Sequence, residues 1–166
     1  NTAPGGSKDM DHSNDRYITD ALRRQGRICD VLLGLALVIL LSSIFTPPAE
    51  VPLHWGADGD VDVYGSPWLT LIVWAVLAAV VALCRLVAAN VDVRYWNKPS
   101  KVQPSELDDW YTHSMSVTYN VCLMISVMAL IYMLRIYWLM FPLIVIAALA
   151  AIACSIYANF NWSKDS

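Results

Sequence analysis

Four side chains suited to metal binding or acid–base chemistry lie close together between residues 52 and 67. Asp58, Asp60 and Asp62 alternate along the chain and follow His54. The spacing Asp-x-Asp-x-Asp opens many calcium-binding loops, and carboxylates together with an imidazole can hold a divalent cation. The sequence therefore makes these four residues the candidates for a metal site.

Two positions count against a calcium loop. Position six of such a loop would be Val63 instead of Gly, and position twelve would be Leu69 instead of Glu. Acidic side chains that cap turns in an exposed loop explain the same residues. His54 could act as a general base, but Ser66 is the one nearby nucleophile. We therefore expect no metal, no cofactor and no catalytic residue here, and we expect His54 to organise the loop through a hydrogen bond.

The composition of the same loop predicts an ordered cap. Prolines restrict its backbone, glycines permit tight turns, and aromatic residues can anchor it at a membrane interface. These residues are Pro47, Pro48, Pro52, Gly56, Gly59, Gly65, Trp55, Tyr64 and Trp68. The loop contains no Lys or Arg.

The elements that hold this loop are apolar enough to cross a membrane. Hydrophobic residues make up 57% of the chain, charged residues make up 15%, and the mean hydropathy is +0.48. A span needs about 20 apolar residues. Helices are expected at 28–46, 68–89, 115–136 and 138–158, with Arg135 and aromatic residues at the turn between the last two. The third helix should start before its span, with Ser105 as its N-cap.

The predicted fold is an all-α integral membrane protein, a bundle of four transmembrane helices with an ordered outer loop between the first two. The membrane domain covers residues 28–158 and includes the outer loop 47–67 and an inner loop 90–114. A polar N-terminal segment, 1–27, precedes it, and a short tail, 159–166, follows. The lipid bilayer is the expected partner, and a nucleic-acid partner is not expected.

Positive residues predict the orientation, because Lys and Arg near helix ends resist translocation. Ten of the eleven fall on one side of the predicted bundle, and Arg135 is the exception. We expect that side to be cytoplasmic, with both termini inside and the loop 47–67 outside the cytoplasmic membrane. The segment Ile18 to Arg27 could form a short helix at the inner surface, where its arginines would attract anionic lipid.

Small residues recur every fourth position on two of the predicted spans. Such stripes allow helices to approach closely in lipid, either within one bundle or between two copies in a homo-oligomer. We favour packing within the bundle. The residues are Ala147, Ala151 and Ser155 on the fourth helix, and Ala75 with Ala79 and Ala78 with Ala82 on the second.

Each predicted span carries one cysteine near its inner end: Cys29, Cys84, Cys122 and Cys154. Thiols on the cytoplasmic side stay reduced, so structural disulfides are not expected. A four-thiolate metal site would need all four side chains to meet at one point, and the chain lacks the paired C-x-x-C spacing that favours this. We expect these cysteines to be small packing residues.

The loop motif resembles that of the domain of unknown function 1648 family, DUF1648. The family pattern is P-x-H-W-N-x-x-G-x-x-D-x-Y-G-S-K. The matching residues are Pro52, His54, Trp55, Gly59, Asp62, Tyr64, Gly65 and Ser66. Two positions differ, with Gly56 at the usual Asn and Pro67 at the usual Lys or Arg. The segment Arg94 to Pro99 is similar to a second conserved stretch of the family.

This resemblance implies a multi-helix membrane protein of bacteria or archaea in which the motif joins the first two helices. The same domain occurs in the immunity protein that protects bacilli from their own sporulation-delaying toxin. The resemblance thus implies a fold and a location, and it makes the eight motif residues the candidate ligand-binding site.

Three classes of function remain open. The preferred one is a membrane protein that binds or senses an envelope ligand, a peptide toxin or a protein partner through the outer loop. The first alternative is an accessory subunit of a transporter or other membrane complex. The second is a membrane enzyme that uses His54 and the loop aspartates. Since no acidic, basic or histidine side chain is expected at mid-membrane, an ion-coupled pump or an intramembrane protease is disfavoured.

Overall fold

The structure, a computed structural model, describes residues 14–44, 50–92, 95–96 and 102–161. The predictions that concern Pro47, Pro48, Arg94 and residues 1–13, 97–101 and 162–166 lie outside these residues, as do those for the side chains of Cys154 and Ser155. The long helices are α1 (Asp20–Ile44), α2 (Leu69–Asn90), α3 (Leu107–Met133) and α4 (Met140–Asn161). The strands are β1 (Val51–Trp55) and β2 (Val61–Gly65), and the short 3-10 helices are η1 (Asn14–Tyr17), η3 (Pro104–Glu106) and η4 (Tyr137–Leu139).

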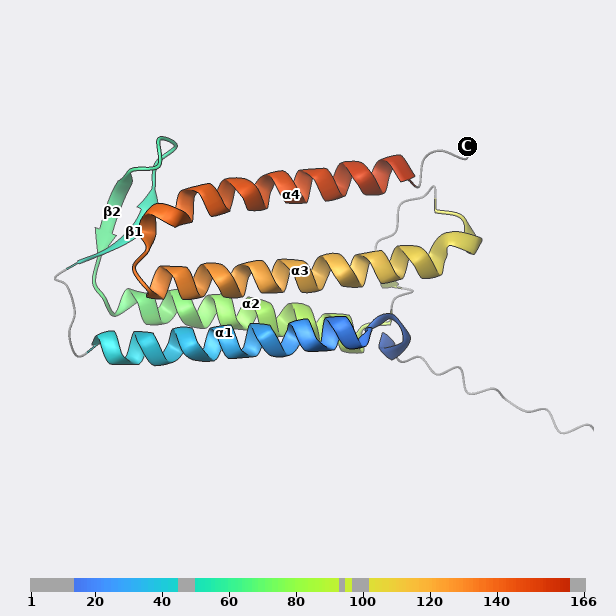
Figure 1. Cartoon of the computed structure of the whole chain (residues 1–166), viewed down its shortest axis with the longest axis horizontal. Coiled ribbons are helices and arrows are strands. Elements are labelled where there is room, and N and C mark those ends of the chain that lie inside the picture. Colours follow the sequence, from blue (N-terminus) through green and yellow to red (C-terminus); the bar gives the residue numbers. More distant parts are fainter. Residues whose placement is uncertain (1–13, 45–49, 93–94, 97–101, 162–166) are drawn as a thin grey trace, which may run out of the picture.

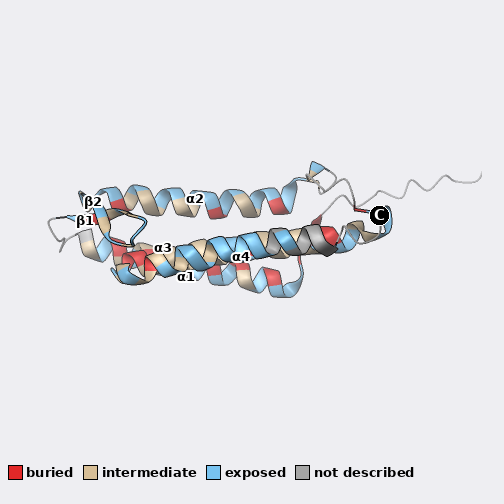
Figure 2. Cartoon of the chain, turned by 90° about the horizontal axis from the view of Figure 1, so that it is seen from above, coloured by how far each residue is buried: buried red, intermediate tan, exposed pale blue. Residues whose placement is uncertain are grey.

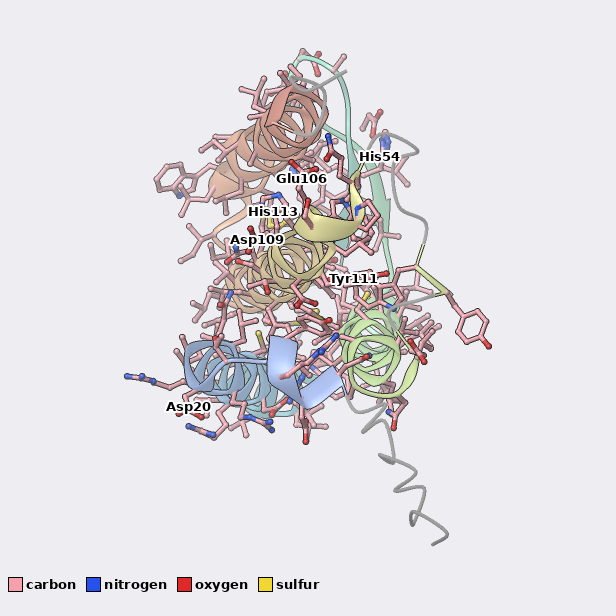
Figure 3. All side chains as sticks on the ribbon, turned by 90° about the vertical axis from the view of Figure 1, so that its right-hand side faces the viewer. Asp20, His54, Glu106, Asp109, Tyr111 and His113 are labelled. Atoms are coloured by element: carbon pink, nitrogen blue, oxygen red, sulfur yellow. The ribbon has the colours of Figure 1, made fainter. Side chains whose placement is uncertain are left out.

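The four long helices lie roughly side by side, and α3 lies between the others (Figure 1). Seen from the end, α4 flanks α3 on one side, while α1 and α2 lie together on the other side (Figure 3). The strands form an antiparallel hairpin beside the turn from α3 to α4, and η1 lies at the opposite end. The predicted all-α class is therefore correct for the bundle but omits this small sheet.

Three helices are long and apolar enough to cross a membrane: Asp20–Ser43, Leu69–Asn90 and Pro104–Met133. The apolar part of α4 in the described residues, Tyr137–Ala153, is shorter. Much of the outside of the bundle is exposed (Figure 2). Many of the exposed residues are large and apolar, among them Val31 at 68%. Such surfaces are stable when lipid covers them. The chain is a multi-pass membrane protein.

The buried core follows α3 at a seven-residue repeat. Met115, Cys122 and Ala129 are each 0% exposed. The positions four residues after them, Tyr119, Ser126 and Met133, are also buried. This spacing keeps one seam of a helix facing its neighbours, as in coiled coils and most helical bundles. The seam faces α1 and α2, because Met115, Cys122 and Met133 each belong to a buried cluster that includes residues of one or both helices.

The residues before α1 are part of the folded body. The side-chain amide of Asn14 donates to the backbone oxygens of Ala88 (2.8 Å) and Val91 (2.6 Å), at the C-terminal end of α2. Helix ends leave such carbonyls without partners inside the helix. Tyr17 is buried and donates to the carboxylate of Asp108 (2.7 Å) on α3. Burial, and then this bond to Asp108, raise the pKa of Tyr17 above its ordinary value.

Two helices start earlier than their apolar stretches. Helix α1 begins at Asp20, where the Thr19 hydroxyl accepts from the N–H of Leu22 (3.3 Å). The segment 18–27 is therefore not a separate surface helix, because residues 20–27 continue directly into the span. Helix α3 begins at Leu107, as expected before its span, but Ser105 is not its cap. Glu106 is the residue before α3, and its carboxylate accepts from the N–H of Gln103 (3.1 Å), which precedes η3.

An ion pair joins α1 and α2 near the η1 end. The Arg85 guanidinium donates to the carboxylate of Asp30. A Cβ atom at Gly26 would lie 3.2 Å from the Arg85 side chain and 3.3 Å from the Tyr119 ring. Glycine at position 26 therefore leaves room for Arg85 to lie across α1 and reach Asp30.

Three of the four cysteines contribute to the packing between α1, α2 and α3. Cys29 and Cys122 are fully buried, Cys84 is half-buried, and all three are free thiols. The Cys122 thiol points to the backbone oxygen of Val81, at 3.9 Å. Each of these side chains lies in or against the same apolar cluster.

The ion pair predicts a measurable coupling between α1 and α2. Replacement of Asp30 by Asn and of Arg85 by Gln, singly and together, should reveal a coupling energy of about 1 kcal/mol, the upper end for a partly exposed pair. Equilibrium unfolding in a mild detergent measures it. Asp20→Asn is the control, because Asp20 is exposed and forms no ion pair among the described residues. Additive effects of the two substitutions would contradict the contact.

Candidate functional site

The loop between α1 and α2 contains a compact β-hairpin with an irregular register. Val51 pairs with Gly65 and Trp55 pairs with Val61, with register shifts on both sides of His54. Such irregularities bend and twist a strand pair and change the direction of the side chains beside them.

The five-residue turn of the hairpin closes through its own hydrogen bonds. The Gly56 N–H donates to the Asp60 oxygen (2.8 Å), and the Gly59 N–H donates to the Gly56 oxygen (3.0 Å). The Asp58 carboxylate accepts from the Asp60 N–H (3.2 Å). Gly59 has φ +88°, in the left-handed region that favours glycine. This turn chemistry is the part of the hairpin that the local sequence specifies.

Three aromatic rings hold the hairpin against the end of the bundle. Trp55 of β1 contacts Tyr132 and Tyr137, with ring centroids 6.2 Å apart in each case. Tyr132 and Tyr137 contact each other at 5.6 Å. The tilted and edge-on geometries are those that aromatic pairs prefer. We refer to Trp55, Tyr132 and Tyr137 as the aromatic clamp.

A buried hydrogen bond completes the attachment. The Tyr132 hydroxyl donates to the backbone oxygen of Pro52 (2.9 Å). Pro52 itself is buried and has no N–H that would need a partner. On the other strand, a Cβ atom at Gly65 would clash with the end of the Leu53 side chain, so a larger residue there would require Leu53 to shift.

The outward side of the hairpin carries a histidine–carboxylate pair. His54 Nδ1 lies 2.7 Å from the Asp62 carboxylate, and the two side chains are 65% and 51% exposed. Tyr64, 57% exposed, lies two residues further along β2. The carboxylate fixes the orientation of the imidazole and leaves Nε2 available to another molecule.

The predicted site residues thus separate into two groups. Those that fix the hairpin are Pro52, Trp55, Gly59 and Gly65; those that are exposed are His54, Asp62, Tyr64 and Ser66. Ser66 belongs with the start of α2, where its carbonyl accepts from the Leu69 N–H (2.9 Å). His54 pairs with Val63, and Ser66 lies three residues beyond Val63. Three residues of extended chain span about 10 Å. The geometry does not bring Ser66 to the imidazole.

The four candidate metal ligands do not converge. The Asp58 carboxylate accepts a bond within the turn, and Asp62 is engaged by His54. Within the described residues, no three His, Cys, Asp or Glu side chains are arranged to hold a metal ion. What the arrangement offers instead is directional hydrogen bonding from His54 and Asp62, beside the ring of Tyr64.

The sequence reasoning missed the role of Tyr132 and Tyr137. Both lie about 80 residues from the hairpin, as the Tyr132–Pro52 separation of 80 shows. The aromatic residues of the turn from α3 to α4 were the available signal, but one sequence does not show which loop they contact.

In the turn between α3 and α4, the backbone of Arg135 has a left-handed conformation, with φ +59°. The Arg135 N–H donates to the Tyr132 oxygen (3.0 Å), and the Ile136 N–H donates to the Ile131 oxygen (3.2 Å). These two bonds form a Schellman motif, in which the left-handed position is usually glycine. The motif directs the chain from Tyr132 to Tyr137 and thereby places both rings beside Trp55.

Loss of the Tyr132 hydroxyl should loosen the hairpin alone. Tyr132→Phe keeps the ring but leaves the buried Pro52 carbonyl without its donor, at a cost of about 1–3 kcal/mol. Hydrogen exchange of the amides in residues 51–65 should accelerate while exchange in α1 and α2 stays unchanged. Tyr137→Phe is the control, since it retains both ring contacts. Equal acceleration in the two variants would contradict the assigned role of the Tyr132 hydroxyl.

The Schellman turn predicts an unusual order of stabilities at position 135. Arg135→Gly should stabilise the protein by about 1 kcal/mol, because glycine adopts positive φ without strain. Arg135→Val should destabilise it, because a branched Cβ is disfavoured there. Thermal unfolding in detergent checks the order, with Arg135→Asn expected to lie between Gly and Val. A glycine variant less stable than the valine variant would be inconsistent with this turn.

The comparison with known families agrees with the motif. Residues 31–79 match the family described as Domain of unknown function (DUF1648). The match covers the second half of α1, the whole hairpin and the first half of α2. No curated protein and no solved structure matches the chain. The expected resemblance to this family is confirmed over residues 31–79.

Proposed function

We propose that the protein binds or senses an envelope ligand, a peptide toxin or a protein partner through its hairpin. The observation that carries the proposal is that one set of residues fixes the hairpin and a different set is exposed on it. The aromatic clamp and the Tyr132–Pro52 bond fix its backbone, while His54, Asp62 and Tyr64 are exposed. A recognition surface gains affinity when its groups are already held in place before binding.

The chemistry of the exposed groups suits a polar or peptide-like ligand. The oriented imidazole can donate or accept at Nε2, the Asp62 carboxylate accepts, and the Tyr64 ring supplies apolar contact area. Tyrosine is enriched among residues that dominate binding energy at interfaces. The surface contains no described Lys or Arg between residues 50 and 67.

The orientation that we propose follows the distribution of cations. Four spans, with α4 (22 residues, about 33 Å at 1.5 Å per residue) as the fourth, put both termini on the cytoplasmic side. The hairpin then faces the outside of a bacterial cell membrane, where it would meet a secreted peptide or an envelope protein first.

A second function, an accessory subunit of a larger membrane complex, is favoured by the surroundings of α4. Ile144, Val145 and Ile146 are all exposed, and three consecutive residues cover about 200° of a helix surface at 100° per residue. Such a helix can offer a face to another membrane protein as well as to lipid. A subunit should co-purify with its partner at a fixed ratio.

Photo-crosslinking in intact cells tests the hairpin proposal. A benzoylphenylalanine at position 64 should give a discrete adduct, and His54→Ala or Asp62→Ala should lower its yield about tenfold, as for the loss of one dominant contact. The matched control is the same probe at Tyr95, which is 82% exposed and lies in the segment between α2 and α3.

Two results would contradict the proposal. One is an adduct at position 64 whose yield is unchanged in both alanine variants, with their unfolding transitions unchanged. The other is an identical set of adducts from positions 64 and 95, which would mean that the probe reports random encounters.

A further inference from the structure

Five arginines with described side chains lie at the η1 end of the bundle, and three of them pair with carboxylates. The pairs are Arg16 with Asp108 (3.3 Å), Arg23 with Asp15 (3.1 Å) and Arg85 with Asp30. Arg24 and Arg27 differ from these three. Both are exposed, and neither forms an ion pair among the described residues.

Arg24 and Arg27 lie at one end of an exposed apolar stripe on α1. Helix α1 runs without interruption from Asp20 to Ile44, so its residues keep a rotation of 100° per position. Residues 24, 27, 28, 31, 35 and 38 therefore lie within about 100° of one another around the helix. The four apolar members are Ile28 (48% exposed), Val31 (68%), Leu35 (48%) and Val38 (63%).

The length of this stripe fits one leaflet of a bilayer. From Ile28 to Val38 the helix rises about 15 Å, half of a hydrocarbon core of about 30 Å. Arg24 and Arg27 follow within about one turn on the η1 side, at the level where lipid phosphates lie. Asp20, one turn further from the apolar residues, is exposed at the helix start (Figure 3).

We propose that this face of α1 is a binding site for an anionic phospholipid. Its phosphate is held by the guanidinium groups of Arg24 and Arg27, and an acyl chain lies along Val31 and Leu35. Guanidinium donates two parallel hydrogen bonds to phosphate oxygens, and an arginine without a carboxylate partner needs no exchange of partners to do so.

The net charge of the lipid headgroup determines which lipid the site prefers. The headgroup of a zwitterionic lipid carries its own ammonium group, which offsets the attraction of the two arginines, whereas the headgroup of phosphatidylglycerol does not. Basic residues near a membrane surface gain affinity for anionic lipid in this way. The site is at the opposite end of the bundle from the hairpin, so it is independent of the proposed ligand surface.

Native mass spectrometry of the full chain tests the site. The protein is reconstituted in bilayer nanodiscs of phosphatidylcholine and phosphatidylglycerol at 3:1, released in mild detergent, and its retained lipids are counted. The wild type should retain phosphatidylglycerol in preference to phosphatidylcholine. Each arginine should contribute roughly fivefold, so the Arg24→Gln/Arg27→Gln variant should lose roughly 25-fold of this preference.

Arg23→Gln is the matched control, because it removes the same charge from a neighbouring position whose guanidinium is paired with Asp15. This control should keep the preference. The single variants Arg24→Gln and Arg27→Gln, each of which leaves one arginine on the face, should lose part of it, and circular dichroism should show unchanged helix content in all variants.

Three outcomes would overturn the proposal. The first is an unchanged preference in the double variant, and the second is an equal loss in Arg23→Gln, which would indicate a general effect of charge. The third is displacement of phosphatidylglycerol from the wild type by inorganic phosphate at constant ionic strength, which would indicate a site for free phosphate instead of lipid.

Discussion

The seven-residue seam of α3 is the interaction on which the rest of the structure depends. Residues 115, 122 and 129, with the positions four after each, are buried along one side of the helix. A helix with this repeat packs along its whole length, so α1 and α2 are held at both ends. One end of α3 therefore stays beside η1, and the other delivers Tyr132 to the hairpin.

The hairpin shows why a two-stranded sheet persists at the end of a helical bundle. Isolated hairpins of two strands are at best marginally stable in water. Here β1 gains a buried hydrogen bond and two aromatic contacts from Tyr132 and Tyr137, while the turn is closed by Gly56, Asp58 and Gly59. The strands are thus stable because of the bundle, and the bundle gains an ordered, polar end that differs in chemistry from its arginine-rich opposite end.

Hydropathy and composition were enough to predict the long helices, since apolar residues cluster where the helices are. They did not predict that the polar residues 20–27 continue into the first span as one helix, whose start beside Thr19 and the buried Leu22 has no apolar run. Turn chemistry predicted an ordered loop but not strands. Tyr132 holds β1 through the Pro52 carbonyl, and a contact between residues 80 positions apart leaves no local pattern in one chain.

The same limit applies to the candidate site. The motif identified His54 and Asp62, but their hydrogen bond follows from the irregular register of the strands, which the motif does not encode. Composition likewise places Asn14 in the polar N-terminal segment 1–27, although this residue is 3% exposed. A polar residue that satisfies the carbonyls at a helix end has the same composition signal as one in solvent.

The position of Asn14 sets an order for the biogenesis of the protein. Asn14 is synthesised 74 residues before Ala88, whose carbonyl it binds. The contact can form only after the first two spans and the hairpin between them have been made and α2 has been inserted with its end on the starting side. The binding of Asn14 to the end of α2 therefore completes the first helical pair.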